Sequence, residues 1–368
     1  MKRNLRQAAG SLLVVGLGGT ELTGLERAWL KLVRPAGVIL FRRNIADARQ
    51  TRALLAEATS LCAPKSFRCV DVEGGTVDRL RDALAPMPSA QAVAQAARRT
   101  GKHGLVREHG ELIARGVKAF GLNTTLAPVL DLAEPDSAEV MGTRAAGSTA
   151  KEVIDYARDF LAGLEAQGVA GCGKHFPGLG GGTLDSHRET PEIRRGAGEL
   201  WQKDLAPYRA LRDNLPMIMV NHAAYPDTPG KNRPASVSPY WITTVLRKRI
   251  GYKGIVFSDD MEMGGILKFM PIEEAVVAAI RAGMDVLEIC QSPELILRAY
   301  EALIAEGERS AAFARLLIGR AESLARRRAE LFAEAAPAAL TARQFEALRG
   351  RIARFSEMIR KAQEAQTA

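Results

Sequence analysis

Eight short apolar runs alternate along the chain with stretches of helical periodicity, and this alternation constrains the fold most strongly. The runs lie at Ser11–Gly16, Gly37–Phe41, Phe67–Val72, Thr125–Leu130, Gly168–Gly173, Met217–Val220, Gly254–Phe257 and Met284–Ile289. Repeated strand–helix alternation requires a parallel sheet covered by helices. Eight such units predict an α/β fold, a (β/α)8 TIM-like barrel whose uneven strand spacing indicates some irregularity. A doubly wound open sheet is the alternative that the pattern alone leaves open.

Polar or charged clusters follow nearly every predicted strand, and their positions favour the barrel. The clusters are Arg42-Arg43-Asn44, Asp71 with Glu73, Asp131, Lys174-His175, Asn221-His222, Ser258-Asp259-Asp260 and Glu288. In barrel enzymes the carboxyl ends of the strands meet on one face and build the active site. We therefore expect these side chains to surround a single cavity.

The domain organisation follows from length and composition. A chain of 368 residues with 47% hydrophobic content can bury a large core, and a barrel commonly takes about 250 residues before insertions. A passage rich in Pro and Ala at 334–340 precedes an amphipathic stretch at 341–368. We predict a barrel catalytic domain at 1–335 and a C-terminal helical extension at 336–368, which packs on the barrel or mediates association.

The basic excess is spread along the chain. The 51 basic and 42 acidic residues give a formal charge of +9, which suits anionic ligands or solubility as well as nucleic acid. The one dense group of arginines is interpreted as a solvated helix face, and no nucleic-acid partner is expected. Its members, near the C-terminus, are Arg315, Arg320, Arg326, Arg327 and Arg328.

Cysteine usage and the N-terminal segment predict a cytoplasmic protein. The four cysteines, Cys62, Cys69, Cys172 and Cys290, have no zinc-like spacing and are expected to be reduced. The basic start and apolar run of the first nineteen residues imitate a signal peptide, but the run at 12–17 is shorter than a usual apolar region of about 7–15 residues. No stretch approaches the roughly 18 apolar residues of a membrane span. An exported or lipid-anchored protein is the alternative.

The segment from Lys174 to Pro191, KHFPGLGGGTLDSHRETP, gathers several chemical side chains around a glycine-rich loop. In an extended segment residues two apart point the same way, so Asp185 can orient the imidazole of His187 and raise its basicity. That spacing makes His187 a candidate proton shuttle. For Asp-Ser-His alone, a capped and solvated surface loop is the competing interpretation.

This segment resembles the signature of the family-3 glycoside hydrolases, and most closely their bacterial β-N-acetylglucosaminidases. The chain keeps KHFPG, Gly180, the spacing to DSH, and Pro191, but carries Leu179 where that family usually has a second histidine. The resemblance implies that His187 is the general acid/base with Asp185 as its partner. It also implies that Lys174 and His175 hold sugar hydroxyls.

A second matching segment is GIVFSDDMEMGG at 254–265. Adjacent carboxylates at a strand end point in different directions, so one can face the cavity while the other caps the following turn. By the resemblance, Asp259 is the nucleophile and Asp260 occupies a variable position.

Further matches complete a resemblance that spans roughly residues 11–300. In CVDVEGGTVDRLR at 69–81, Asp71 and Arg79 match residues that bind the non-reducing sugar, and a carboxylate at a strand end can accept two vicinal hydroxyls. In MGTRAAG at 141–147, Arg144 matches a substrate-contacting arginine, although Ala145–Ala146 stands where an aromatic residue usually follows it. NTTLAPVLDL at 123–132 is similar to the family's fourth strand.

The resemblance predicts a retaining hydrolase that releases terminal β-linked N-acetylglucosamine, for example from cell-wall muropeptide fragments during recycling. No metal or organic cofactor is required, and the oligomeric state stays open. Three alternatives remain. They are a phosphorylase, in which a histidine tolerates phosphate as acceptor, a silent sugar-binding homologue, and a metal-dependent hydrolase using His175, His187, His222, Asp185 and Asp259.

Overall fold

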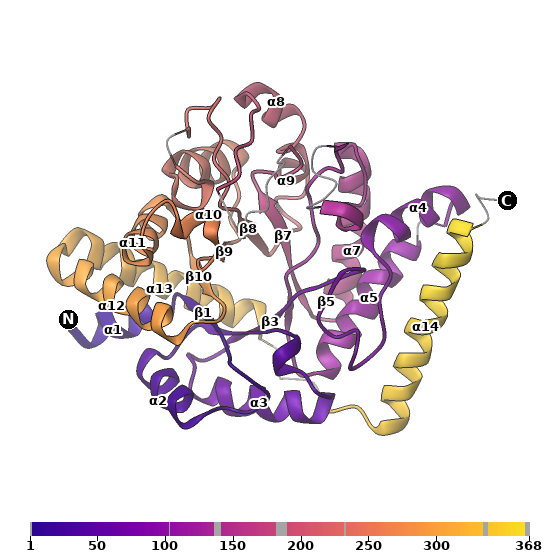
Figure 1. Ribbon diagram of the computed structural model, residues 1–368, viewed down its shortest axis with the longest axis horizontal. Coiled ribbons are helices and arrows are strands. Elements are labelled where there is room, and N and C mark those ends of the chain that lie inside the picture. The colour runs from indigo at the N-terminus through magenta and orange to yellow at the C-terminus, as the bar shows by residue number, and fades with distance from the viewer. Residues whose placement is uncertain are drawn as a thin grey trace.

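A closed barrel of parallel strands forms the centre of the molecule (Figure 1). The computed structural model describes residues 2–102, 104–135, 141–181, 190–231, 233–333 and 338–364. Within these ranges eight strands pair side by side in the order β1-β10-β9-β8-β7-β6-β3-β2, and every pair is parallel. They are β1 (Leu13–Gly16), β2 (Gly37–Leu40), β3 (Phe67–Val70), β6 (Thr124–Thr125), β7 (Ala170–Phe176), β8 (Met217–Val220), β9 (Ile255–Asp260) and β10 (Val286–Ile289). The predicted barrel is confirmed, and because β1 pairs with both β2 and β10 the open sheet is excluded.

Helices connect successive strands and cover the outside of the barrel (Figure 1). Those that follow the eight strands in turn are α2 (Gly24–Val33), α3 (Ala48–Ser60), α5 (Gly104–Ala119), α7 (Ala150–Ala166), α9 (Ala206–Ala210), η5 (Tyr240–Ile250), α11 (Ile272–Ala282) and α12 (Pro293–Arg309). The other described helices are α1 (Lys2–Gly10), η1 (Arg42–Asn44), α4 (Ala90–Thr100), η3 (Gly142–Arg144), α8 (Ala197–Gln202), η4 (Ala235–Val237), α10 (Gly264–Leu267), α13 (Ala311–Leu331) and α14 (Ala342–Glu364). The sequence determines where two of these helices begin, because Thr23 and Thr149 form capping boxes with Glu26 and Glu152 at the first turns of α2 and α7.

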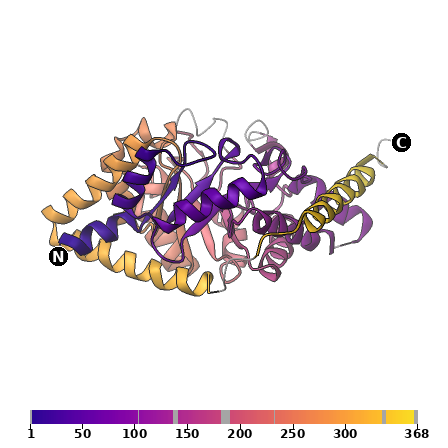
Figure 2. The same cartoon turned by 90° about the horizontal axis from the view of Figure 1, so that it is seen from below.

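An insertion between β3 and β6 adds a small antiparallel hairpin, β4 (Val72–Gly74) with β5 (Val77–Asp78), followed by α4 and α5. Helix α14 packs on α4 and α5, and Figure 2 shows it in yellow at the end of the molecule away from the N-terminus. Phe355 of α14 stacks on the imidazole of His109 in α5, with ring centroids 6.0 Å apart. Burial lowers the pKa of His109 to about 3, so a neutral ring completes this contact.

The predicted C-terminal extension is therefore a helix packed on the barrel's outer layer. The predicted boundary between 335 and 336 lies outside the described residues. The apolar run near the N-terminus, which imitates a signal peptide, supplies barrel strand β1.

Two further expectations are tested by burial. All four cysteines are free and buried. The solvated face expected for the arginine group is wrong for Arg328, which is only 2% exposed and donates from Nη1 to the carbonyl of Ala36 at 2.9 Å. Helical spacing shows which residues share a face of a helix, but it does not show whether that face meets solvent or other helices. The structure decides this, because α13 packs against α12 and α1. Of the helices that the structure describes, none combines the length and apolarity needed to cross a membrane.

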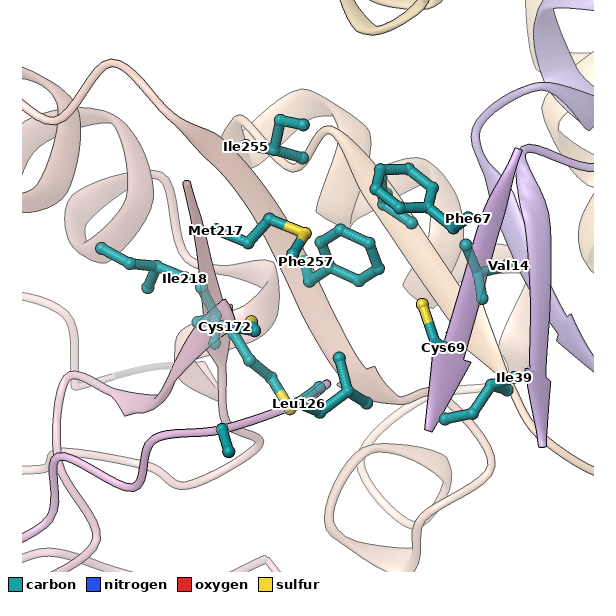
Figure 3. Close-up of a cluster of buried hydrophobic side chains, with 14 of the residues drawn as sticks. Val14, Ile39, Phe67, Cys69, Leu126, Cys172, Met217, Ile218, Ile255 and Phe257 are labelled. Carbon is teal, nitrogen blue, oxygen red and sulfur yellow. The ribbon is translucent and has the colours of Figure 1, made fainter. Parts of the chain in front are cut away.

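The alternation of side-chain direction along each strand determines which residues fill the barrel interior. Residues two apart on a strand share a face, so Phe67 and Cys69 of β3 point inward with Ile255 and Phe257 of β9 (Figure 3). The rings of Phe67 and Phe257 meet edge to face, with centroids 5.0 Å apart. Such packing closes the interior, so a ligand can enter only at an end of the barrel.

Helices α5 and α7 approach closely because glycines face each other where they cross. A Cβ added at Gly110 would lie 2.2 Å from the carbonyl oxygen of Phe160, and one at Gly163 would lie 2.3 Å from that of Arg107. Real Cβ atoms do not come so near to backbone, so the two helices can keep this distance only with glycine.

We expect Gly110→Ala to lower the free energy of unfolding by about 1–3 kcal/mol, since overpacking forces the helices apart. Gly319→Ala in α13, where an added Cβ meets nothing within 4 Å, is the matched control and should raise stability by about 0.5–1 kcal/mol through helix propensity. Urea unfolding measures both. Equal stabilisation by the two alanines would contradict the close crossing.

Candidate active site

The same alternation of side-chain direction places reactive side chains at the mouth of the barrel, at the carboxyl ends of the strands. Asp71 continues the inward series Phe67, Cys69, and Asp259 continues Ile255, Phe257. Both carboxylates line a cavity that also receives Lys174 from β7, Glu288 from β10 and Arg79 after the hairpin. The cavity thus collects residues that lie up to 251 positions apart in the chain, from Ile39 to Cys290.

Lys174 ties the floor of the cavity together. Its Nζ lies 2.8 Å from Asp71 Oδ1 and 2.6 Å from Glu73 Oε1, and its side chain is only 4% exposed. Burial lowers the pKa of Lys174, but Asp71 and Glu73 outweigh it and hold the pKa above its ordinary value. The amine is therefore a fixed cation that can still donate to a ligand, because an ammonium has three N–H donors.

Arg144 of η3 forms a two-pronged ion pair with Glu73. Its Nε and Nη2 each donate to a Glu73 oxygen at 2.8 Å. Burial raises the pKa of Glu73, yet Lys174 and Arg144 overcome that effect and keep the pKa far below the usual range. Glu73 was absent from the predicted site residues, although the Asp-x-Glu-Gly-Gly match contains it.

His175 is held by a carboxylate on its own side of the barrel. Its Nδ1 lies 2.6 Å from Asp131 Oδ2, while Asp131 Oδ1 accepts the backbone N–H of Leu179 at 2.7 Å. An acceptor at Nδ1 places the proton there and leaves Nε2 as an acceptor, and Nε2 lies 3.3 Å from Arg144 Nη2. Asp131 therefore orients His175 and the start of the glycine-rich loop together.

The two adjacent carboxylates of β9 have different partners. Asp259 Oδ1 accepts the backbone N–H of Asp260 at 2.9 Å. Burial raises the pKa of Asp259, but His175, His222, this N–H and Lys174 bring it below its ordinary value. Asp259 is thus an ionised carboxylate at the cavity.

Asp260 serves the turn that follows the strand. Its Oδ1 accepts the N–H of Glu262 at 3.0 Å and that of Cys290 at 3.2 Å. Burial and the neighbouring Glu262 raise its pKa to about 7. Asp260 caps the turn as expected, but it also lines the cavity beside Asp259. The two carboxylates therefore differ in their hydrogen bonds and share the cavity wall.

His222 follows β8 and supports the carboxyl end of the neighbouring strand β9. Its Nδ1 lies 2.7 Å from Ser236 Oγ and its Nε2 lies 3.0 Å from the carbonyl of Asp260. The ring is fully buried, and burial lowers its pKa. His222 Nε2 donates to the Asp260 carbonyl and fixes the backbone beside Asp259.

Arg79 completes the rim next to Asp71. Its Nη2 lies 4.0 Å from Asp71 Oδ2, and its guanidinium carbon lies 5.8 Å from the centre of the Phe41 ring. Its buried Nε has no hydrogen-bond partner among the described residues. Asp71 Oδ2 and Arg79 together leave acceptor and donor capacity on this wall.

The predicted Asp185 and His187 lie outside the described residues, as do 182–184, 186, 188 and 189. The flanking residues are described. Leu179 lines the cavity, and Thr190 Oγ1 donates to the carbonyl of Gly265 at 2.8 Å. Where the usual histidine would stand, Leu179 offers the cavity only apolar contact.

The sequence indicates Glu288 only as a polar residue at a strand end, and in the structure it lines the cavity. The side chain is 2% exposed, and its Oε1 has no hydrogen-bond partner in the described part of the chain. Burial and the carboxylates Asp71, Asp260 and Asp259 raise its pKa well above the ordinary value. The surroundings of Glu288 therefore favour its neutral form, and its Oε1 is a buried polar atom without a partner among the described residues.

The pKa of Glu288 makes a stability prediction. A carboxyl whose pKa is higher in the folded state contributes stability below its unfolded pKa and loses it as the pH rises through the folded pKa. Relative to wild type, Glu288→Gln should thus gain free energy of unfolding as the pH rises from about 4.5, since Gln mimics the neutral acid.

Urea unfolding across that range measures this difference, and Glu301→Gln, at an exposed position of α12, controls for the loss of a carboxyl. A gain at Glu288 that is the same at all pH values would show that the carboxyl is not perturbed.

Together these residues form a polar cup suited to a polyhydroxylated ligand, with an ionised carboxylate on one wall. Buried charges are paired by Lys174 and Arg144, while Asp71, Arg79 and Glu288 retain hydrogen-bonding capacity. In the described ranges no group of three or more His, Cys, Asp or Glu side chains is arranged to hold a metal ion.

Known proteins are similar to this chain in sequence and in fold. Residues 5–316 match the model of the Glycosyl hydrolase family 3 N terminal domain. A beta-hexosaminidase of Methylococcus capsulatus is 40% identical over 290 residues, which cover 78% of this chain and 85% of that protein. One of Alkalilimnicola ehrlichii is 39% identical over 287 residues, covering 77% and 82%.

Solved structures agree. A family 3 β-N-acetylglucosaminidase from Paenibacillus sp. strain FPU-7 superposes with a TM-score of 0.84 at 31% identity, covering 96% of this chain and 68% of that one. NagZ from Neisseria gonorrhoeae, in complex with N-trifluoroacetyl-D-glucosamine, gives 0.79 at 28% identity, covering 94% and 98%.

Proposed function

The chain belongs to glycoside hydrolase family 3, and we propose that it is a retaining β-N-acetylhexosaminidase with Asp259 as its nucleophile. One observation carries this proposal most: Asp259 is an ionised carboxylate that faces a cavity lined by the buried Lys174 and by Arg144. A retaining glycosidase needs such a carboxylate on one side of the anomeric carbon and a proton donor on the other.

In the first step, Asp259 attacks the anomeric carbon and the bond to the leaving-group oxygen breaks. His187 protonates that oxygen as it leaves. In the second step, His187 takes a proton from water, the water oxygen attacks the anomeric carbon, and the bond to Asp259 breaks. Asp185 orients the imidazole and balances its charge when His187 is cationic.

The sugar is proposed to bind across the cup. Asp71 Oδ2 lies 4.0 Å from Arg79 Nη2 and accepts hydrogen bonds from sugar hydroxyls. Lys174 and Arg144 donate hydrogen bonds to the sugar from their fixed positions. His175, oriented by Asp131, contacts the same hydroxyls. The relatives named beta-hexosaminidase and the neighbour named β-N-acetylglucosaminidase support N-acetylglucosamine as the sugar.

The proposed natural substrates are cell-wall muropeptide fragments carrying terminal β-linked N-acetylglucosamine. Their anionic groups suit a chain with formal charge +9. Four free, buried cysteines fit a reducing compartment, which supports a cytoplasmic location.

A panel of p-nitrophenyl β-glycosides tests the proposal. We expect kcat/KM for the N-acetylglucosaminide to exceed that for the glucoside and the xyloside by at least about tenfold, since a site that binds a polar group discriminates against substrates lacking it. Preference for glucoside would overturn the sugar assignment, and no turnover of any glycoside would indicate a silent homologue. Sugar 1-phosphate formed in phosphate buffer would identify a phosphorylase.

The nucleophile has its own test. Asp259→Ala should lower kcat at least about a thousandfold even for activated substrates, because no covalent intermediate can form. Asp260→Asn is the matched control: its side chain accepts two backbone N–H groups, so it should act mainly through stability and keep kcat within about tenfold. Equal, mild losses in both variants would refute the assignment.

The acid/base assignment predicts a dependence on the leaving group. His187→Ala should slow substrates with poor leaving groups by about 10²–10⁴-fold and those with good ones far less, because only the former need protonation. Asp185→Ala should show the same pattern, whereas Ser186→Ala should leave the ratio unchanged.

If His187→Ala instead left both substrate types equally active, His187 would not be the proton donor. The donor would then be sought among Glu73, His175 and His222.

A further inference from the structure

A second concave site lies at the opposite end of two barrel strands. Gly254 and Asp285 immediately precede β9 and β10, whereas Asp259 lies near the carboxyl end of β9. Five residues of extended strand separate Gly254 from Asp259 by about 16 Å. Helix α13 reaches this end of the strands through Arg320 and Arg327, which donate to the carbonyls of Gly283 and Gly254.

The walls of this site carry a large excess of positive charge. The cavity has a volume of about 480 Å³, within the range of small-molecule sites. Five basic side chains and a single carboxylate, Asp285, contribute to its walls. The basic residues are Arg247, Lys253, Arg315, Arg320 and Arg327.

Three guanidinium groups converge on Asp285, which is 5% exposed. Arg247 Nη2 lies 2.6 Å from Asp285 Oδ2, Arg320 Nη1 lies 3.2 Å from Oδ1, and Arg327 Nη1 lies 3.3 Å from Oδ2. Backbone carbonyls hold the same groups, since Arg247 and Arg327 both donate to Gly254. One carboxylate neutralises one of the three cations, so two charges are left in a rigid arrangement.

The electrostatics of Arg320 show this imbalance. Burial lowers its pKa, and repulsion from Arg247 and Arg327 acts in the same direction against the attraction of Asp285. Its buried Nε has no hydrogen-bond partner among the described residues. A buried donor without an acceptor costs free energy, which adds to the cost of the unbalanced positive charge around Asp285.

Two longer side chains complete the site from its rim. Lys253 and Arg315 are exposed, line the cavity, and form no ion pair among the described residues. The hydroxyl of Ser323, on the wall formed by α13, adds a neutral donor. Planar guanidinium groups and an ammonium around one concave surface match the geometry of a phosphate group.

We propose that this cavity is a binding site for a phosphate group, either as inorganic phosphate or on a small phosphate monoester. The ligand sits over Arg247, Arg320 and Arg327, and Lys253 and Arg315 close on it from the rim. The proposal is independent of the glycosidase mechanism, because the site shares no residue with the cavity that holds Asp259.

Isothermal titration calorimetry of the full chain with inorganic phosphate and with glycerol 3-phosphate, at constant ionic strength set by chloride, tests this proposal. The rim variant Lys253→Gln/Arg315→Gln removes two exposed charges and leaves the arginines at Asp285 in place. The control Lys248→Gln/Arg326→Gln removes the same charge from exposed positions of η5 and α13 that do not line the cavity.

We expect saturable binding to wild type, a dissociation constant at least about tenfold higher in the rim variant, and one within about twofold of wild type in the control. Tighter binding of glycerol 3-phosphate would identify an ester as the ligand, and equal or tighter binding of inorganic phosphate would identify the free ion. Either result supports the site.

Absence of binding at millimolar phosphate would overturn the proposal. So would equal weakening in both double variants, which would indicate general surface charge. Binding that survives in the rim variant and is displaced by N-acetylglucosamine would assign phosphate to the other cavity and refute this one.

Discussion

Closing eight parallel strands into a barrel fixes the direction of every side chain on them, and the two sites depend on this constraint. Because inward and outward positions alternate, the series Ile255, Phe257, Asp259 runs from the packed interior to a carboxylate at the mouth. Phe67, Cys69, Asp71 does the same on β3. The aromatic packing between Phe67 and Phe257 supports both carboxylates from below.

At the mouth, charge compensation decides which carboxyl groups are ionised. Glu73 stays charged because Lys174 and Arg144 contact it directly. Among the described residues Glu288 has no such partner, and it lies near three acidic groups, so it favours the neutral form. A cluster of carboxyls is thereby divided into anions that orient cations and a neutral acid that can donate a hydrogen bond. This division gives the proposed nucleophile its charge without filling the cavity with mutual repulsion.

The opposite end of the barrel has the reverse arrangement. There a single carboxylate, Asp285, gathers three arginines from η5 and α13. The same strands thus end in an acidic cup at one face and a basic cup at the other, with the apolar interior between them. Each is suited to a different ligand, a neutral polyol on one side and an oxyanion on the other.

The strand–helix alternation by itself determined a parallel sheet covered by helices, and the polar strand ends favoured the barrel over an open sheet. Motif spacing singled out Asp71, Lys174 and Asp259, which the structure brings to one cavity. The sequence could place these residues at one cavity because the alternation of side-chain direction is a local property of each strand. The roles given to these residues, and to Asp185 and His187 outside the described ranges, are still predictions. Only the tertiary structure decided that Asp131 orients His175, that the surroundings of Glu288 raise its pKa, and that arginines expected in solvent converge on Asp285. These features depend on pairs far apart in sequence, whose distances, and therefore whose electrostatic interactions, are set by barrel closure and helix packing.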